Sequence, residues 1–257
     1  MSSNKTESGF VWFVGGGPGP VDLLTLRAHN VLKQAEVILY DALLDPGFLE
    51  VFPLGATILY VGKRSGEHYR TQTEINSLLV QFAKAKKRVI RLKGGDPSIF
   101  GRLTEEIQAL EKENISYELV PGVSSVTAGA ASLGVSLTVR GLSRQIIILD
   151  GHSILEDNKS WLGMENFTGT IAILMGSNHT AELAKKLIEK GITPNTPMAL
   201  LEGVGSPNET YTLSSVGNVK TEGFVKKTKG PGILYVGEAL RCLETKLLKN
   251  QTSQYES

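Results

Sequence analysis

Residues 91–102 read Arg-Leu-Lys-Gly-Gly-Asp-Pro-Ser-Ile-Phe-Gly-Arg and bring together residue types that could bind a polar ligand. Gly94 and Gly95 have no side chain, so a ligand could approach their backbone closely. Asp96 could accept hydrogen bonds from hydroxyl or ammonium groups, and Arg102 adds a cation further along. The same residues also suit a plain Gly-Asp-Pro turn that caps a helix. Taken alone, the segment leaves a ligand loop and a structural turn both open.

The elements around this segment predict an α/β fold. An apolar run at 88–92 precedes it and a helical pattern follows, so it lies where a buried strand ends. In open α/β sheets, ligands bind at the carboxyl ends of strands. Strand, turn and helix repeat along the first half, which predicts βαβ units around a mostly parallel sheet. The expected strands are 10–14, 37–40, 57–61, 89–92 and 117–120, and the expected helices are 23–34, 72–86, 103–114 and 126–133.

A short polar stretch, 136–144, is a suitable linker, and the pattern restarts after it. Helices are sparser there and threonine is commoner, so we expect a mixed sheet. The strands are expected at 145–149, 170–175, 198–202, 209–213 and 232–236, and the helices at 181–190 and 238–249. We therefore predict two α/β domains, 10–138 with a mostly parallel sheet and 139–249 with a mixed sheet, and a cleft between them.

Composition excludes several classes of function. The 257 residues are 41% hydrophobic and 21% charged, with a net charge of +1, so no broad basic field indicates nucleic acid. The single cysteine excludes an intrachain disulfide framework, and the four histidines show no metal-ligand spacing. The first nine residues are polar and no apolar run is long enough to span a bilayer. We expect a soluble, cytoplasmic protein without a bound metal or a membrane partner.

The glycine-rich loop Gly15–Pro20 invites comparison with a dinucleotide-binding loop. It follows a strand and precedes a helix, and Asp41 lies about twenty residues on. However, Pro20 stands where that fingerprint needs a glycine, and Pro18 stiffens the loop. We therefore expect no NAD site; the loop forms either the floor of another pocket or a tight structural turn.

Cations also gather near predicted strand ends. Such charges are usually just solvated, but here several would lie on one rim of the sheet. A rim of this kind suits a ligand with several carboxylates, because arginine binds each one with two parallel hydrogen bonds. The residues concerned are Lys63, Arg64, His68, Arg70, Arg102, Arg140 and Arg144.

Several further motifs occur in order along about residues 10–240. They are Val-Gly-Gly-Gly-Pro-Gly at 14–19, Tyr-Asp-Ala-Leu at 40–43, Val-Gly-Lys-Arg at 61–64, Gly-Gly-Asp-Pro at 94–97 with Phe-Gly-Arg at 100–102, and Val-Pro-Gly-Val-Ser-Ser at 120–125. Leu-Met-Gly at 174–176 and Ala-Leu-Leu-Glu at 199–202 continue the series. Together they resemble the tetrapyrrole methylase family, and within it the branch that methylates uroporphyrinogen III.

The resemblance implies methyl transfer from S-adenosylmethionine (SAM) to pyrrole carbons, giving precorrin-2 by way of precorrin-1, on the way to sirohaem and cobalamin. It also implies a fold of two α/β domains with a cofactor cleft between them, and a homodimer. The implied cofactor contacts are Pro18, Gly94, Gly95, Asp96, Ile99, Ser124, Ser125, Met175, Val204 and Gly232. Methylating a pyrrole carbon requires loss of the N–H proton, so a proton-accepting group should lie nearby. The family pattern offers Asp41, Arg102 and Glu105 as catalytic candidates, with Lys63 as a partner, and we expect Arg102 to clamp and orient the substrate. Arg64 and Arg140 would then hold its propionate and acetate groups.

The chain departs from the family pattern in three places. Pro20 replaces an expected Asp, Leu103-Thr104 replaces two glycines, and Val139 replaces a His. These departures leave the exact substrate open. Two other interpretations therefore stand beside the first: another precorrin methylase of the same fold, or a non-catalytic nucleotide-binding module.

Overall fold

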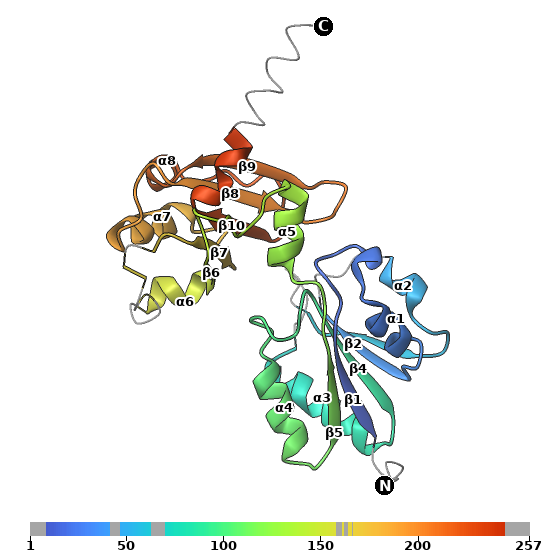
Figure 1. The fold of residues 1–257 in the computed structure, drawn as a ribbon. Coiled ribbons are helices and arrows are strands. Elements are labelled where there is room, and N and C mark those ends of the chain that lie inside the picture. Colours follow the sequence, from blue (N-terminus) through green and yellow to red (C-terminus); the bar gives the residue numbers. More distant parts are fainter. Residues whose placement is uncertain are drawn as a thin grey trace, which may run out of the picture. The chain divides into compact units, whose positions relative to one another are not determined.

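A computed structural model describes residues 9–41, 47–62, 70–157, 161, 164–165 and 167–244. The chain divides into two compact units, Met1–Ser125 and Val126–Ser257, each built on a five-stranded sheet within those residues (Figure 1). The predicted α/β class is confirmed. Across the described ranges, no helix has the length and apolar character needed to cross a bilayer.

The first sheet is parallel throughout, in the order β3-β2-β4-β1-β5. Its strands are β1 (Phe10–Gly15), β2 (Val37–Tyr40), β3 (Thr57–Tyr60), β4 (Arg88–Lys93) and β5 (Ser116–Val120). Because parallel neighbours end at one edge, the loops after β1, β2 and β4 lie at the same side of the sheet. Those loops contain the glycine-rich loop, Asp41 and the Gly-Gly-Asp segment.

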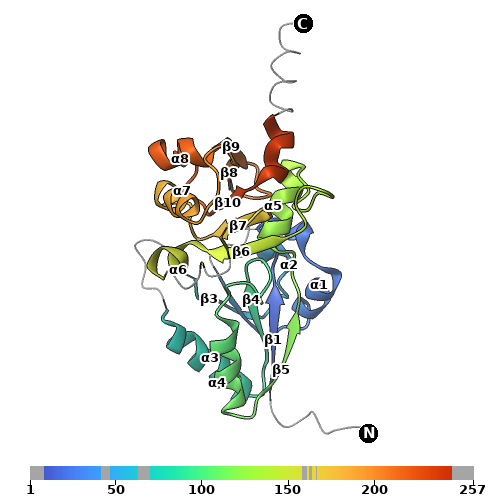
Figure 2. The same cartoon turned by 60° about the vertical axis from the view of Figure 1, so that its left-hand side comes forward.

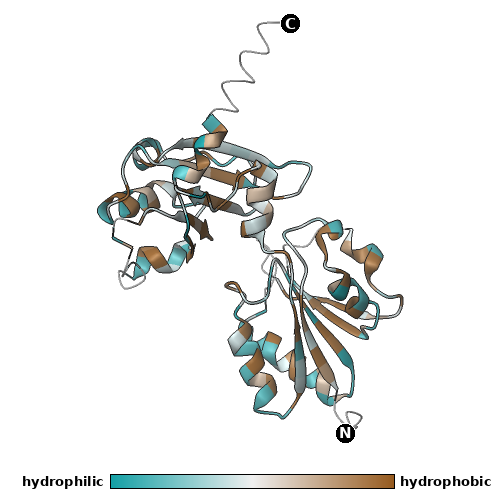
Figure 3. Cartoon of the chain, viewed as in Figure 1, coloured by the Kyte–Doolittle hydropathy of each residue, from teal (hydrophilic) through white to brown (hydrophobic). Residues whose placement is uncertain are grey.

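Helices cover both faces of this sheet, α3 (Gln72–Lys84) and α4 (Leu103–Glu111) on one and α1 (Leu26–Leu32) and α2 (Phe48–Val51) on the other (Figure 2). Strand alternation decides which residue faces which layer. Val89 of β4 packs with Leu79 and Leu110 of the α3/α4 layer, whereas Ile90 packs with Leu32 of the α1 layer. In Figure 3 the strands of this sheet are accordingly mostly hydrophobic.

The helix expected at 23–34 is broken. A short 3-10 turn, Val21–Leu23, comes first, and α1 begins only after Thr25. The cause is local: Thr25 has extended backbone angles, and its hydroxyl accepts a hydrogen bond from the Ala28 N–H at 3.1 Å. A threonine in this position caps a new helix rather than continuing an old one.

The second sheet is mixed, as predicted, in the order β6-β7-β10-β8-β9. β6 (Ile146–Asp150) and β7 (Thr170–Leu174) are parallel, whereas β8 (Pro197–Glu202), β9 (Thr210–Ser215) and β10 (Gly232–Val236) form antiparallel pairs. One face packs against α6 (Gly151–Glu156), α7 (Thr180–Glu189) and α8 (Val216–Glu222). The sequence pattern predicted α7 but not α6 or α8. Each of those two is short and begins at a polar cap, Asp150 or Ser215.

Helix α5 (Ser125–Leu133) was expected in the first domain, but its side chains pack on the second sheet. Val126 and Ala130 belong to the same buried cluster as Leu201 and Tyr235, and the Tyr235 hydroxyl donates to the Val126 carbonyl at 2.8 Å. The compact units consequently meet at 125/126, whereas the linker expectation had placed the boundary at 138/139. The polar stretch at 136–144 instead contains a turn in which Val139 pairs with Ser143. Beyond η3 (Glu238–Leu240), the expected last helix runs into residues outside the described ranges.

Candidate functional site

Three glycine-containing loops meet backbone to backbone at the carboxyl edge of the first sheet. Gly17 and Gly95 exchange two hydrogen bonds, at 3.2 Å and 2.6 Å between N and O. A Cβ on Gly122 would lie 2.3 Å from the Gly95 carbonyl oxygen, and one on Gly15 would lie 2.5 Å from the Gly122 Cα. These contacts are closer than any side chain allows, so the glycines are required by packing. In the segment at 91–102, Gly95 takes part in this packing through its backbone N–H and carbonyl groups, and its φ of +68° favours glycine.

Asp96 holds two of these loops together. Its Oδ1 accepts from the Ser98 N–H at 2.9 Å and from the Ser98 hydroxyl, and its Oδ2 accepts from the Gly122 N–H at 2.9 Å. Burial would raise the pKa of Asp96, but these hydrogen bonds from Ser98 and Gly122 outweigh it and lower that pKa. Each carboxylate oxygen has two acceptor positions, so the clamp does not exhaust Asp96.

Gly95 leaves space where its neighbours do not. It adopts a φ of +68°, and among the residues that the structure describes a Cβ there would have only the Ser125 nitrogen, at 3.8 Å, within 4 Å. Ser124 and Ser125 lie at the start of α5, and Ile99 donates its N–H to the Asp96 carbonyl at 3.2 Å. The predicted contacts Gly94, Gly95, Asp96 and Ile99 thus share one loop, with Pro18 on the loop bonded to it and Ser124 and Ser125 beyond Gly122.

A buried arginine lies directly behind Asp41. The Arg91 side chain on the central strand β4 is 3% exposed, and its Nη2 donates to Asp41 Oδ1 at 2.6 Å. Its Nε donates to Glu106 Oε1 at 2.9 Å, and its Nη1 donates to the Leu92 carbonyl at 3.1 Å. Burial would lower the pKa of Arg91, but the charges of Asp41 and Glu106 outweigh it and raise that pKa. The guanidinium is therefore charged and held on three sides.

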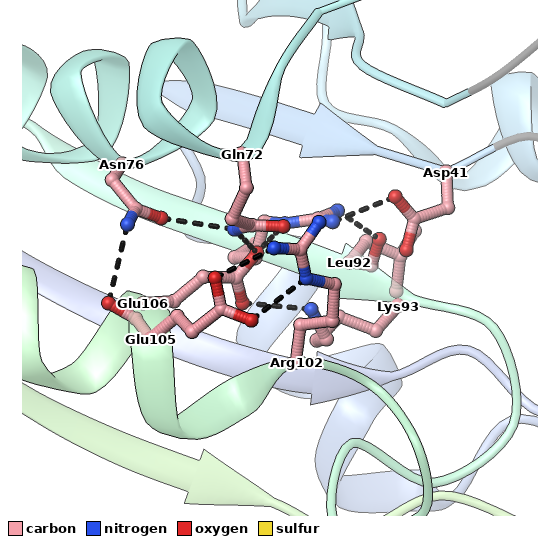
Figure 4. A network of polar contacts seen from close by, with 9 residues as sticks. Asp41, Gln72, Asn76, Leu92, Lys93, Arg102, Glu105 and Glu106 are labelled. Carbon is pink, nitrogen blue, oxygen red and sulfur yellow. Dashed lines mark hydrogen bonds and ion pairs between the residues drawn. The ribbon is translucent and has the colours of Figure 1, made fainter. Parts of the chain in front are cut away.

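Glu106 is the centre of this network (Figure 4). Its side chain is 0% exposed and also accepts from Lys93 Nζ at 2.7 Å and from Gln72 Nε2 at 3.2 Å. Burial and the neighbouring charge of Arg91 lower the pKa of Lys93, although the carboxylate of Glu106 opposes them. Gln72 in turn donates to Asn76 at 2.9 Å, and Asn76 donates to the Glu105 carbonyl at 3.2 Å.

Arg102 and Glu105 form a forked ion pair on the surface at the start of α4. The two bonds are Nε to Oε1 at 2.8 Å and Nη2 to Oε2 at 2.7 Å. The hydrogen bonds to Glu105 raise the pKa of Arg102 and lower that of Glu105. Arg102 has a φ of +52°, an uncommon left-handed conformation for a side chain of its size. A charged arginine of this kind suits the predicted clamp rather than a proton acceptor.

In the second unit, three predicted cofactor contacts lie at one edge of the sheet. Met175 follows the end of β7, Val204 follows β8, and Gly232 begins the antiparallel β10, where it pairs with Glu202. Met175 is exposed and has a φ of +57°, so its backbone is strained at a surface position. The buried carboxylate of Glu202 accepts from the N–H groups of Lys227 and Thr228, which holds the segment that leads into β10.

The structure describes only some of the remaining predicted residues. Lys63, Arg64 and His68 lie outside the described residues. Arg140 is exposed in the second unit, in the turn between Val139 and Ser143. The structure therefore does not test a shared cationic rim. No cluster of three or more His, Cys, Asp or Glu side chains with metal-binding geometry occurs in the described part of the chain.

Sequence reasoning missed the roles of Arg91 and Lys93 and did not choose Glu106 over its neighbour Glu105. The sequence does contain a pattern that indicates this buried network. Arg91 and Lys93 alternate with Ile90 and Leu92 in a strand predicted to be buried, and buried charges need partners. Two cations on one face of a buried strand predict a buried carboxylate beside them.

The family of the chain follows from comparison with known proteins. The family model for tetrapyrrole (corrin/porphyrin) methylases matches residues 11–220. The chain belongs to this family. This confirms the resemblance seen in the motifs, and the family match includes residues of both sheets.

Among individual methylase relatives, the S-adenosyl-L-methionine-dependent uroporphyrinogen III methyltransferase of Methanosarcina barkeri is 39% identical over 243 residues, which are 93% of this chain and 94% of the relative. The siroheme synthase of Nitrosomonas eutropha is 36% identical over 98% of this chain, but the match spans only 53% of that longer protein. Among solved structures, the uroporphyrin-III C-methyltransferase of Thermus thermophilus, complexed with S-adenosyl homocysteine (SAH), has a TM-score of 0.79 at 34% identity, covering 91% of this chain and all of that one.

Proposed function

We propose that this methylase is an S-adenosylmethionine-dependent uroporphyrinogen-III C-methyltransferase that makes precorrin-2 by way of precorrin-1. The observation that carries the proposal is the match over nearly the whole chain to enzymes named for this reaction. The product would feed sirohaem or cobalamin synthesis, and the similarity to siroheme synthases supports the first of these routes.

The residues present fit the methyl donor. Gly95 offers bare backbone with open space beside it, and Asp96 keeps acceptor capacity beyond its contacts with Ser98 and Gly122. We infer that the first unit contributes Pro18, Gly94–Asp96, Ile99, Ser124 and Ser125 to the binding of SAM, and that the second contributes Met175, Val204 and Gly232. When bound, SAM supplies an activated methyl group, so the protein mainly has to align the reacting atoms.

The substrate brings negative charge and an N–H proton, and the chain has candidates for both. Arg102, held by Glu105 in a defined orientation, would clamp a carboxylate of the tetrapyrrole, with Arg64 and Arg140 as further anchors. Asp41 would accept or relay the pyrrole proton, because only its Oδ1 accepts a hydrogen bond from a residue in the described ranges. Lys63 would assist as its partner.

The deciding experiment incubates the purified protein anaerobically with SAM and uroporphyrinogen III. We expect a product carrying two added methyl groups by mass and the absorbance of a dipyrrocorphin after both transfers. Asp41→Asn should lower kcat strongly while SAH binding, measured by calorimetry, stays unchanged. SAH binding without any methylated product would contradict the proposal and favour a different precorrin as substrate.

We also infer that the protein is a homodimer, as the family resemblance implies. Light scattering coupled to size exclusion would show a mass near twice the 27.7 kDa of one chain. A single 27.7 kDa species at micromolar concentration would contradict this. The cytoplasmic location stays a prediction.

A further inference from the structure

The charges behind Asp41 are too costly to be explained by stability alone. Arg91, Lys93 and Glu106 are all nearly or fully out of contact with solvent, each at 4% side-chain exposure or less. Replacing a buried ion pair by apolar residues of similar size is often neutral or stabilising, because desolvation offsets the attraction. The face of β4 that carries Arg91 and Lys93 also packs against apolar side chains of α3 and α4. A purely structural role would be better served by leucine or methionine.

The exposure of Asp41 indicates what the buried charges of Arg91, Lys93 and Glu106 do. The charged side chains of Arg91, Lys93 and Glu106 are buried, whereas the Asp41 side chain, at the end of β2, is 27% exposed. Gln72, which donates to Glu106, is also partly exposed but carries no charge. Oδ1 of Asp41 is bound by Arg91, and Oδ2 accepts no hydrogen bond from any residue in the described ranges. The carboxylate is therefore held by one oxygen from behind while it presents the other.

Arg91 is suited to this task because its three bonds go to three different elements. Its Nη2 bonds to Asp41 after β2, its Nε bonds to Glu106 on α4, and its Nη1 bonds to the carbonyl of Leu92 on its own strand. These bonds constrain the plane of the guanidinium. A lysine at this position would keep the charge, but one ammonium cannot reproduce the spread of this planar fork.

We propose that Arg91 and Glu106 are positioning residues for methyl transfer: Glu106 orients Arg91, and Arg91 orients the Asp41 carboxylate toward the substrate. This inference rests on the proposed function and adds two residues to it. It also separates the adjacent glutamates, since Glu105 pairs with the surface Arg102 whereas Glu106 acts from inside the fold. Neither Arg91 nor Glu106 is expected to touch substrate or cofactor.

The test is a double-mutant cycle on kcat with Arg91→Lys, Asp41→Asn and the combined variant. If Arg91 acts through Asp41, Arg91→Lys lowers kcat by a factor on the order of 100 in the wild type, as expected for a misplaced reacting group. The same substitution then has little further effect in the Asp41→Asn background, because residues that act as a unit are not additive. The affinity for SAH should stay within about twofold throughout.

The matched control is Arg88→Lys. Arg88 lies on the same strand β4 and also pairs with a glutamate, Glu36, but it does so at the opposite end of the strand. This variant should keep wild-type kcat and KM. Glu106→Gln is the second variant, in case Arg91→Lys does not fold. It keeps the side-chain size and one acceptor oxygen, and its loss of kcat should likewise vanish in the Asp41→Asn background.

The outcomes separate the two proposals. A wild-type protein that makes no methylated product overturns the proposed function and this role with it. An active wild type with additive losses in the cycle, or with unchanged kcat in Arg91→Lys or Glu106→Gln, overturns only the positioning role. A fall in SAH affinity equal to the fall in kcat would also overturn it, because the defect would then be a general one.

Discussion

At the scale of single residues, the polar side chains at the first sheet's carboxyl edge are bound to the protein itself before any ligand arrives. Asp96 joins its own loop to Gly122, Arg91 holds Asp41, and Glu105 holds Arg102. Such contacts keep groups in one orientation, which is how a site lowers the entropic cost of aligning reactants. Sequence predicts which residues have useful chemistry here, but it does not predict which are already paired.

The pH dependence of stability should report the Asp96 clamp. Hydrogen bonds lower the pKa of Asp96 below its ordinary value of 3.8, so the carboxylate stabilises the folded state above that pH. This contribution is lost as pH falls from 3.8 toward the lower pKa of the folded protein. Asp96→Asn should therefore cost about 1 kcal/mol near neutral pH, a modest value because solvent partly screens the site. Urea unfolding at a series of pH values should show this difference shrinking in acid.

At the scale of elements, the parallel strands were predictable because each is a short apolar run followed by a turn. The ends of helices were less so: Thr25 restarts a helix that apolar periodicity alone would continue. Arg91 and Lys93 lie inside a run that is otherwise apolar, and only the three-dimensional approach of α4 shows that Glu106 pairs with both of them. Helix α5 follows the first sheet in sequence but packs on the second, and no local pattern distinguishes these alternatives.

The close packing of the glycine loops predicts how a substitution in them affects stability and SAH binding. In Gly122→Ala, the new methyl group would meet the Gly95 carbonyl oxygen at 2.3 Å, and the backbone would have to move. We expect a loss of about 1–3 kcal/mol in unfolding free energy and weaker SAH binding, because the displaced loop carries Gly95 and Asp96. Urea unfolding and calorimetry measure the two effects.

Gly55→Asn is the control for that substitution. Gly55 has a φ of +86°, which asparagine tolerates better than most residues, and a Cβ there meets no atom of the described ranges within 4 Å. It should leave SAH affinity unchanged. Wild-type affinity in Gly122→Ala would show that the packed loops do not shape the cofactor site.

At the scale of the whole molecule, family membership and two α/β units were both predictable from the order of motifs. Their boundary was not, because it depends on where α5 packs. The family model matches residues of both units, and the residues proposed above for SAM binding are likewise drawn from both.

Ligand binding should therefore stabilise the whole chain. SAH at about 100 times its Kd adds roughly 2.7 kcal/mol to the folded state, which corresponds to a rise in Tm of about 5–10 °C for a chain of this size. Asp96→Ala should reduce that shift markedly, because it removes the bonds that hold the Gly-Gly-Asp segment to Gly122. Differential scanning calorimetry with and without SAH measures the shift in Tm. An undiminished shift in Asp96→Ala would place the cofactor elsewhere.

The position of β10 in the second sheet has a consequence for synthesis. This strand comes last among those described, yet it lies between β7 and β8. On the ribosome, the β6–β7 pair and the β8–β9 hairpin therefore emerge as two separate halves, each with an unpaired edge, until residues 232–236 leave the exit tunnel and join them. The first sheet has no such delay after β5. Nascent chains stalled before Gly232 should thus expose strand edges of the kind that chaperones bind and that aggregate when left unprotected.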